Sequence, residues 1–176
     1  MNHSTRLRIA FRGIALILLG CTGIPAGLQP VDGFDAGRYL GKWYEIARLD
    51  HSFERGLTNV TAEYSLLEGG GVQVINRGYS ERQRKWKQAR GKAYFVQGAD
   101  RGFLKVSFFG PFYGSYVIFE LDQEHYQYAL VSGPDTSYLW ILARSPDMDK
   151  DLLRTLIAKA SQAGFDTSGL ILVRHD

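Results

Sequence analysis

Residues 41–144 contain eight short stretches in which apolar and polar side chains alternate, and this series constrains the fold more than any other feature. Successive side chains of a β-strand point to opposite faces, so each stretch predicts a strand with one buried face. Glycine, proline and acidic residues interrupt the chain between stretches, for example at 69–71 and 133–135, which is typical of short antiparallel connections. The predicted strands are 41–49, 57–67, 72–79, 88–96, 103–109, 113–121, 126–132 and 138–144.

One helix is predicted after these strands, followed by a short strand at 169–174. The apolar stripe of the helix consists of Leu152, Leu153, Leu156, Ile157 and Ala160, and Gly164 marks its end. Eight meandering strands followed by one helix favour a closed barrel. The predicted fold is therefore all-β: an eight-stranded antiparallel up-and-down β-barrel with one C-terminal α-helix packed outside and a short final strand.

The geometry of such a barrel brings the first and last of the eight strands together. The eighth strand lies beside the first and ends where the first begins. Trp43, two residues after Gly41, should therefore meet Arg144 in a cation–π contact that plugs one end of the barrel. Alternation within the first strand puts Trp43, Glu45 and Ala47 on one face and Tyr44, Ile46 and Arg48 on the other.

Residues 1–20 predict a lipoprotein signal peptide rather than part of the fold. Three arginines precede the short apolar run 14–19, which is far shorter than the roughly 20 residues of a membrane-spanning helix. The sequence Leu-Leu-Gly-Cys at 18–21 resembles a lipobox and predicts lipidation of Cys21; a free thiol is the alternative. Residues 21–33, rich in Gly and Pro, predict the lipidated cysteine and a flexible tether, so that the folded domain occupies 34–176.

Charge and residue spacing argue against several other functions. The sequence has 21 Lys and Arg against 18 Asp and Glu, and three of the arginines lie in the predicted signal peptide. Residues 1–20 contain no acidic residue, so the rest of the chain has 18 basic and 18 acidic side chains. A chain with no net charge offers no electrostatic case for binding nucleic acid. His51, His125 and His175 lack metal-ligand spacing, and no nucleophile or phosphate-loop motif occurs, so we predict no catalytic residue, metal or cofactor. A single cysteine permits no internal disulfide.

Three segments resemble the three conserved regions of lipocalins: 41–45 (Gly-Lys-Trp-Tyr-Glu), 128–135 (Tyr-Ala-Leu-Val-Ser-Gly-Pro-Asp) and 139–144 (Leu-Trp-Ile-Leu-Ala-Arg). Segments 48–57 and 105–114, together with the lipobox, are similar to the bacterial outer-membrane lipoproteins of that family. The resemblance implies a lipocalin domain at 34–176 that binds a small apolar molecule in a cup-shaped barrel. It also implies a lipid-anchored location in the outer membrane of a Gram-negative bacterium, with the domain facing the periplasm.

Parity along the strands predicts a mostly apolar wall inside the barrel. An eight-stranded barrel is just wide enough for one small ligand, and small inward residues such as Ala89 and Ala93 leave space. If the ligand is a lipid, its polar head group is expected at the open end of the barrel near Tyr113. Arg48 and Arg55 are the expected partners of an anionic head group. The predicted lining residues are Ala62, Tyr64, Val74, Asn76, Phe95, Val106, Phe108, Tyr113, Trp140 and Leu142.

Three classes of function remain open. The first is an outer-membrane-anchored carrier that binds, stores or transports fatty acids or lysophospholipids. The second is an envelope interaction or structural lipoprotein with a filled barrel, and the third is a lipocalin-type enzyme. Loop 108–113 is too apolar for an ordinary solvated turn, so its aromatics are expected to touch the membrane or a second copy in a homodimer. The alternative is that Phe109 and Phe112 fold inward and cap the core.

Overall fold

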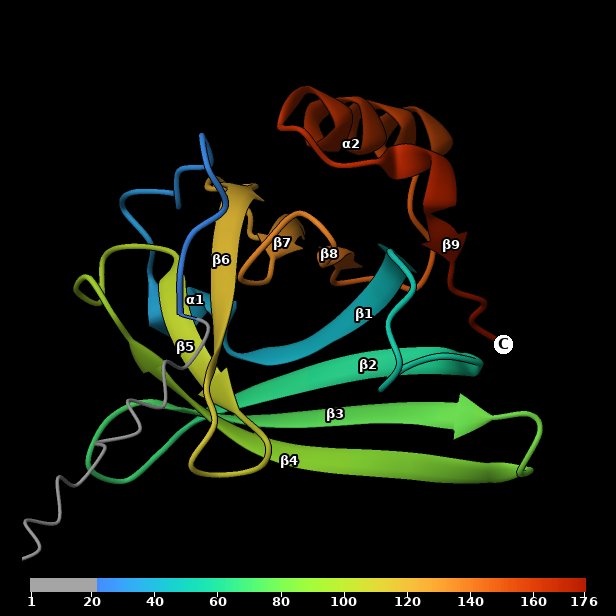
Figure 1. Cartoon of the computed structure of the whole chain (residues 1–176), viewed down its shortest axis with the longest axis horizontal. Helices are drawn as coiled ribbons and strands as arrows, with labels where there is room; N and C mark the ends of the chain where they lie inside the picture. The colour runs from blue at the N-terminus through green and yellow to red at the C-terminus, as the bar shows by residue number, and fades with distance from the viewer. Residues whose placement is uncertain (1–21) are drawn as a thin grey trace, which may run out of the picture.

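The structure, a computed structural model, describes residues 22–176, so the predicted signal peptide and Cys21 lie outside the described residues. Nine strands form one sheet that curls into a barrel (Figure 1). The strands are β1 (Gly41–Arg48), β2 (Leu57–Leu66), β3 (Val72–Ser80), β4 (Lys85–Phe95), β5 (Phe103–Ser107), β6 (Gly114–Leu121), β7 (Tyr128–Ser132), β8 (Leu139–Ala143) and β9 (Ile171–Leu172). The helices are α1 (Ala36–Tyr39), α2 (Lys150–Gln162) and a short 3-10 helix (Thr167–Gly169).

Strand β1 closes the barrel because it pairs with both β2 and β8. Tyr44 lies opposite Thr61 on β2 and opposite Ala143 on β8. From β2 to β8 each strand pairs antiparallel with the next in sequence, and β9 adds to β1 outside the closed ring. The predicted eight-stranded up-and-down barrel with a C-terminal helix and a short final strand is confirmed.

A bulge in β1 reverses the predicted orientation of its last residues. The register with β8 shifts between Glu45 and Ala47, which inserts one extra residue into β1. Ala47 therefore packs in the apolar cluster outside the barrel, whereas Arg48 turns inward to contact Glu45. The prediction that Ala47 shares a face with Trp43 and that Arg48 faces the other way is wrong.

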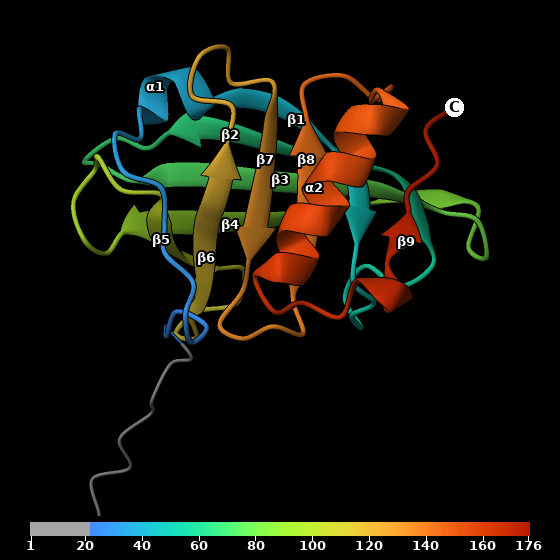
Figure 2. The ribbon, with the colours of Figure 1, turned by 90° about the horizontal axis from the view of Figure 1, so that it is seen from above.

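Helix α2 lies over the outer face of β7 and β8 (Figure 2). Asp149 caps its first turn by accepting hydrogen bonds from the backbone N–H groups of Asp151 and Leu152. Leu156 and Ala160 on the helix are buried in one apolar cluster with side chains on the outer barrel face. Because the helix finds its partners outside the barrel, the interior stays available for a separate site.

The segment 22–33 packs along the barrel, although the sequence predicts a flexible tether there. Leu28 is buried in the outer apolar cluster. Val31 donates a hydrogen bond to the Ile118 carbonyl at 2.9 Å and accepts one from the Gly102 N–H at 2.8 Å. The packed part of the chain therefore begins before residue 34, and the tether prediction is corrected for these residues.

Candidate ligand cavity

A cavity of about 760 Å³ lies inside the barrel, within the range of small-molecule sites. The structure places all ten predicted lining residues along its wall. The loops at the open end complete the wall with aromatic side chains. These are Phe53, Phe109, Phe112 and Tyr138. Most of the remaining wall is apolar, including Val72 and Leu104, so the cavity is suited to a hydrocarbon chain.

Three tyrosines hydrogen-bond one another in the wall near the closed end. The Tyr116 hydroxyl lies 2.8 Å from that of Tyr39 and 2.7 Å from that of Tyr64. Burial raises the pKa of all three phenols above the ordinary value, so they stay neutral at physiological pH. Tyr39 and Tyr116 were not predicted from the sequence as lining residues. Alternation could have identified Tyr116, because its neighbour Val117 is buried in the outer apolar cluster and adjacent strand residues face opposite sides.

The closed end is held together by Gly41, Trp43 and Arg144, which the structure brings into contact. The Arg144 guanidinium lies 4.0 Å from the ring centroid of Trp43, which is fully buried. Arg144 also donates hydrogen bonds to the carbonyls of Lys42 (2.9 Å), Arg38 (2.7 Å) and Tyr126 (3.2 Å). Gly41 has a φ of +89°, a conformation that glycine adopts without strain.

A buried polar cluster adjoins the open end of the cavity. Arg48 donates to Glu45 Oε1 at 2.7 Å and to the Glu54 carbonyl at 3.0 Å. Glu54 Oε2 accepts a hydrogen bond from Trp140 Nε1 at 3.1 Å and lies 3.1 Å from His51 Nε2. Burial, reinforced by the charge of Glu54, raises the pKa of Glu45. Burial alone would raise the pKa of Glu54, but hydrogen bonding and charge from His51, with the Trp140 hydrogen bond, lower it.

This cluster overturns the prediction that Arg48 and Arg55 hold an anionic head group. Arg48 is 1% exposed and already bound to acceptors of the protein, because the β1 bulge turns it inward. Arg55 points to solvent and pairs with Asp50 at 2.6 Å. Lys105 is a cation beside the predicted head-group position, with Nζ 5.3 Å from the ring centroid of Tyr113.

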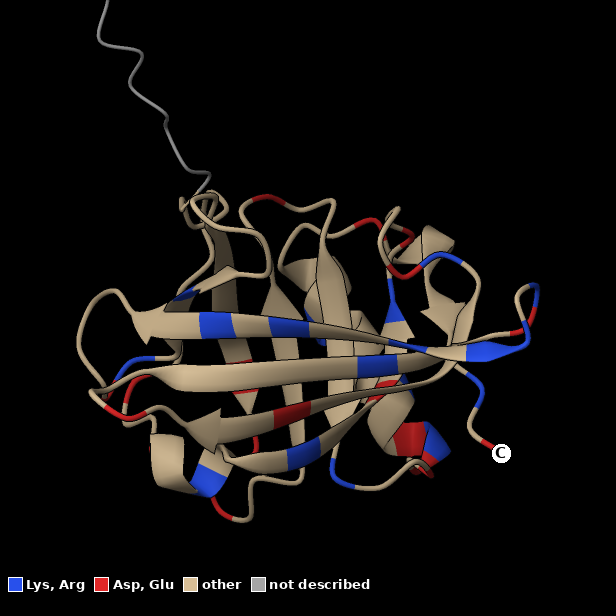
Figure 3. Ribbon diagram, turned by 90° about the horizontal axis from the view of Figure 1, so that it is seen from below, with Lys and Arg blue, Asp and Glu red and all other residues tan. Residues whose placement is uncertain are grey.

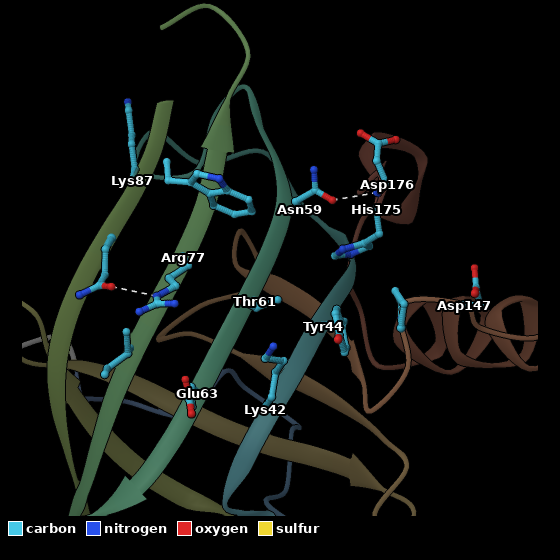
Figure 4. Close-up of a pocket in the computed structure, with 14 residues that line it drawn as sticks. Lys42, Tyr44, Asn59, Thr61, Glu63, Arg77, Lys87, Asp147, His175 and Asp176 are labelled. Carbon is cyan, nitrogen blue, oxygen red and sulfur yellow. Dashed lines mark hydrogen bonds between the residues drawn. The ribbon is translucent and has the colours of Figure 1, made fainter. Parts of the chain in front are cut away.

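A second hollow, of about 920 Å³, lies outside the barrel, against β1–β4 and the C-terminal residues (Figure 4). Its walls carry charges of both signs, including Lys42, Glu63 and Arg77. Arg77 is bound to Gln88 at 2.9 Å, and Asn59 Oδ1 accepts from the Asp176 N–H at 2.8 Å. A surface hollow of this polarity is poorly suited to a hydrocarbon chain, so the interior cavity is the better candidate for an apolar ligand.

Within 22–176, no group of three or more His, Cys, Asp or Glu side chains is arranged to hold a metal ion. None of the helices in the same range combines the length and the apolar character required to cross a membrane.

Comparisons with known proteins agree with this architecture. The family model of the lipocalin-like domain matches residues 34–175. Outer membrane lipoprotein Blc of Vibrio cholerae is 58% identical over 161 residues, which cover 92% of this chain and 94% of that protein. The protein of the same name from Escherichia coli K12 is 50% identical over 169 residues, or 95% of each chain.

Solved structures show the same fold at lower identity. Insecticyanin from the tobacco hornworm Manduca sexta superposes with a TM-score of 0.69 and 22% identity, covering 88% of this chain and 87% of that chain. Lobster apocrustacyanin A1 gives a TM-score of 0.65 at 18% identity, covering 87% and 93%. From the family match and the identity to the bacterial relatives, the chain belongs to the lipocalin family.

Proposed function

We propose that this lipocalin binds one fatty acid or lysophospholipid in the interior cavity and carries or stores it at the outer membrane. The observation that carries the proposal is the apolar cavity of about 760 Å³, which extends from the tyrosines near the closed end to the aromatic loops of the mouth. A hydrocarbon chain gains free energy by leaving water for such a wall, at about 0.8 kcal/mol per buried CH₂.

The ligand enters tail-first in this proposal. Its chain runs past Trp140 toward Leu104, and its head group stays at the mouth near Tyr113, where Lys105 supplies a positive charge. Glu54 lies in the same wall and is held ionised by its partners, which disfavours a bare carboxylate beside it. A head group placed on the Tyr113 side avoids that repulsion.

Two observations support a location at the outer membrane: the names of the relatives and the sequence before Cys21. Two relatives that cover nearly the whole chain are named outer membrane lipoprotein, and Cys21 follows a lipobox-like sequence. We infer that Cys21 carries acyl chains that anchor the domain to the outer membrane on its periplasmic side. Two or more chains hold a protein on a membrane far more firmly than one.

The test is a lipid titration with a matched pair of variants on β4. Ala93 is 3% exposed and lines the cavity, whereas the neighbouring Lys92 points to solvent. In Ala93→Trp the indole occupies the volume of the ligand. Binding of a fluorescent fatty acid, and therefore its displacement by lysophospholipid, should be lost. Lys92→Trp should bind as the wild type does.

Thermal melting of both variants checks that the barrel remains folded. A second test replaces Tyr113 and Trp140 with Ala, which should weaken binding. If a folded Ala93→Trp variant binds lysophospholipid with wild-type affinity, the ligand does not occupy this cavity and the proposal fails.

A further inference from the structure

The described chain begins at the open end of the barrel. Ser115, the second residue of β6, donates a hydrogen bond from Oγ to the carbonyl of Gly23 at 2.5 Å. β6 starts at the mouth, because the loop before it carries Phe109 and Phe112, which line the open end of the cavity. Figure 2 shows the start of the described segment beside the loops that precede β6 and β8.

From the mouth the N-terminal segment runs along the outer wall toward the closed end. Leu28 is buried on the way, and Val31 is fixed by its two hydrogen bonds to Gly102 and Ile118. Asp32 pairs with Arg101, just before β5, with Oδ1 3.0 Å from the guanidinium Nε. These contacts fix the direction of the segment, so that Thr22 lies at the mouth end.

Consecutive Cα atoms are about 3.8 Å apart, so acyl chains on the residue before Thr22 enter the bilayer close to the mouth. This step rests on the lipid anchor at Cys21 that the proposed function includes. An anchor joined directly to the mouth end, without a long tether, favours an orientation in which the open end of the barrel faces the membrane.

The mouth itself presents aromatic side chains to solvent. Phe53 is 59%, Phe109 80% and Phe112 63% exposed. Residues 108–113 (Phe-Phe-Gly-Pro-Phe-Tyr) carry no charged side chain. Exposed aromatics in an uncharged loop suit the interface between lipid head groups and acyl chains.

The charges near the mouth do not oppose this contact. Arg55 and Asp50 neutralise each other in an ion pair, and Asp135 accepts hydrogen bonds from Ser137 in its own turn. Lys and Arg residues occur along strands of the barrel (blue in Figure 3), whereas the sequence of loop 108–113 contains none.

We propose that the mouth end docks on a phospholipid bilayer, with loop 108–113 inserted at the interface, so that the cavity opens directly into the membrane. A lipid then moves between bilayer and barrel without crossing water. A second copy of the chain covering the same loop is the competing occupant, and the experiment below separates the two.

Single introduced cysteines test the orientation, because the sequence has no cysteine besides Cys21. Phe109→Cys and Leu66→Cys each carry a thiol-reactive, environment-sensitive fluorophore on the full, lipidated chain. Leu66 is the matched control, since it is 66% exposed and ends β2 at the closed end. The proteins are reconstituted in phosphatidylethanolamine–phosphatidylglycerol vesicles, with and without brominated acyl chains, which quench fluorophores that reach the bilayer.

The fluorophore at residue 109 should show blue-shifted emission and lose most of its intensity in brominated vesicles, whereas that at residue 66 should change little. Phe112→Cys should repeat the result for 109. Equal quenching at 109 and 66, or stronger quenching at 66, would overturn the proposal. So would unquenched emission at 109 that shifts only with protein density, because that would place a second copy on the loop. Lipid titration of the unlipidated protein in solution separates this outcome from failure of the cavity itself.

Discussion

Replacing Arg144 with Met removes the closure of the barrel end while keeping an apolar stem. The guanidinium stacks at 4.0 Å on the ring of Trp43 and donates hydrogen bonds to three backbone carbonyls. These carbonyls belong to α1 (Arg38), β1 (Lys42) and the β6–β7 connection (Tyr126), so one side chain joins three other parts of the chain.

The magnitude follows from those contacts. Each carbonyl hydrogen bond contributes about 0.5–1 kcal/mol net at this half-buried site, since freed carbonyls regain water. The cation–π contact adds about 1 kcal/mol. Methionine retains part of the packing on Trp43, so we expect the free energy of unfolding to decrease by about 2–4 kcal/mol in total. For a domain of this size, that corresponds to a decrease in Tm of about 4–16 °C.

Thermal melting and urea unfolding of Arg144→Met, followed by circular dichroism, measure this loss. Arg154→Met is the matched control, because Arg154 lies on the exposed face of α2 and pairs with Asp151 at the surface. The free energy of unfolding of Arg154→Met should differ from that of the wild type by no more than about 0.5 kcal/mol. If both variants melt together, Arg144 does not close the barrel, and the account of the plugged end is wrong.

Three further predictions concern the tyrosines, the N-terminal segment and the anchor. Burial raises the pKa of Tyr39, Tyr64 and Tyr116 in the folded state above the value in the unfolded chain. Their contribution to stability is therefore complete below pH ~10. Above that pH the free energy of unfolding falls by about 1.4 kcal/mol per pH unit for each tyrosine, because the unfolded chain loses protons that the folded state keeps. Tyr116→Phe should flatten the fall in urea midpoint between pH ~9 and ~11, and an unchanged slope would contradict this. Leu28→Ala should lower the free energy of unfolding by about 2 kcal/mol; an unchanged urea midpoint would show that the segment packs weakly. Cys21→Ser should leave the protein soluble or unprocessed, and mature protein in the membrane fraction would disprove the anchor.

The sequence predicted the barrel and the inward positions along its wall because alternation runs through most of β2–β8, although the register also shifts within β2 and β6. Inward positions such as Val74 and Leu142 alternate with outward residues, and the structure keeps that order. Trp43 and Arg144 were paired by topology alone, because an even number of strands returns the chain to the end where it began.

The errors at β1 have one local cause. The bulge after Glu45 adds a residue that no pattern in the strand marks, and parity beyond it is reversed. Arg48 consequently joins Glu45 and Glu54 in a buried cluster instead of meeting a ligand. The N-terminal segment was misread for a different reason. Its glycines and prolines suggested a tether, but Leu28 and Val31 find apolar and backbone partners in barrel strands and loops that lie far away in the sequence.

Native mass spectrometry of the protein purified from its own membranes tests the central claim most directly. The account predicts a one-to-one complex with a mass added by a fatty acid or lysophospholipid, and its absence from the folded Ala93→Trp variant. Lys92→Trp should retain the complex. Wild-type protein that carries no lipid, and gains none when lysophospholipid is added, would contradict the claim that the barrel is a lipid-binding cup.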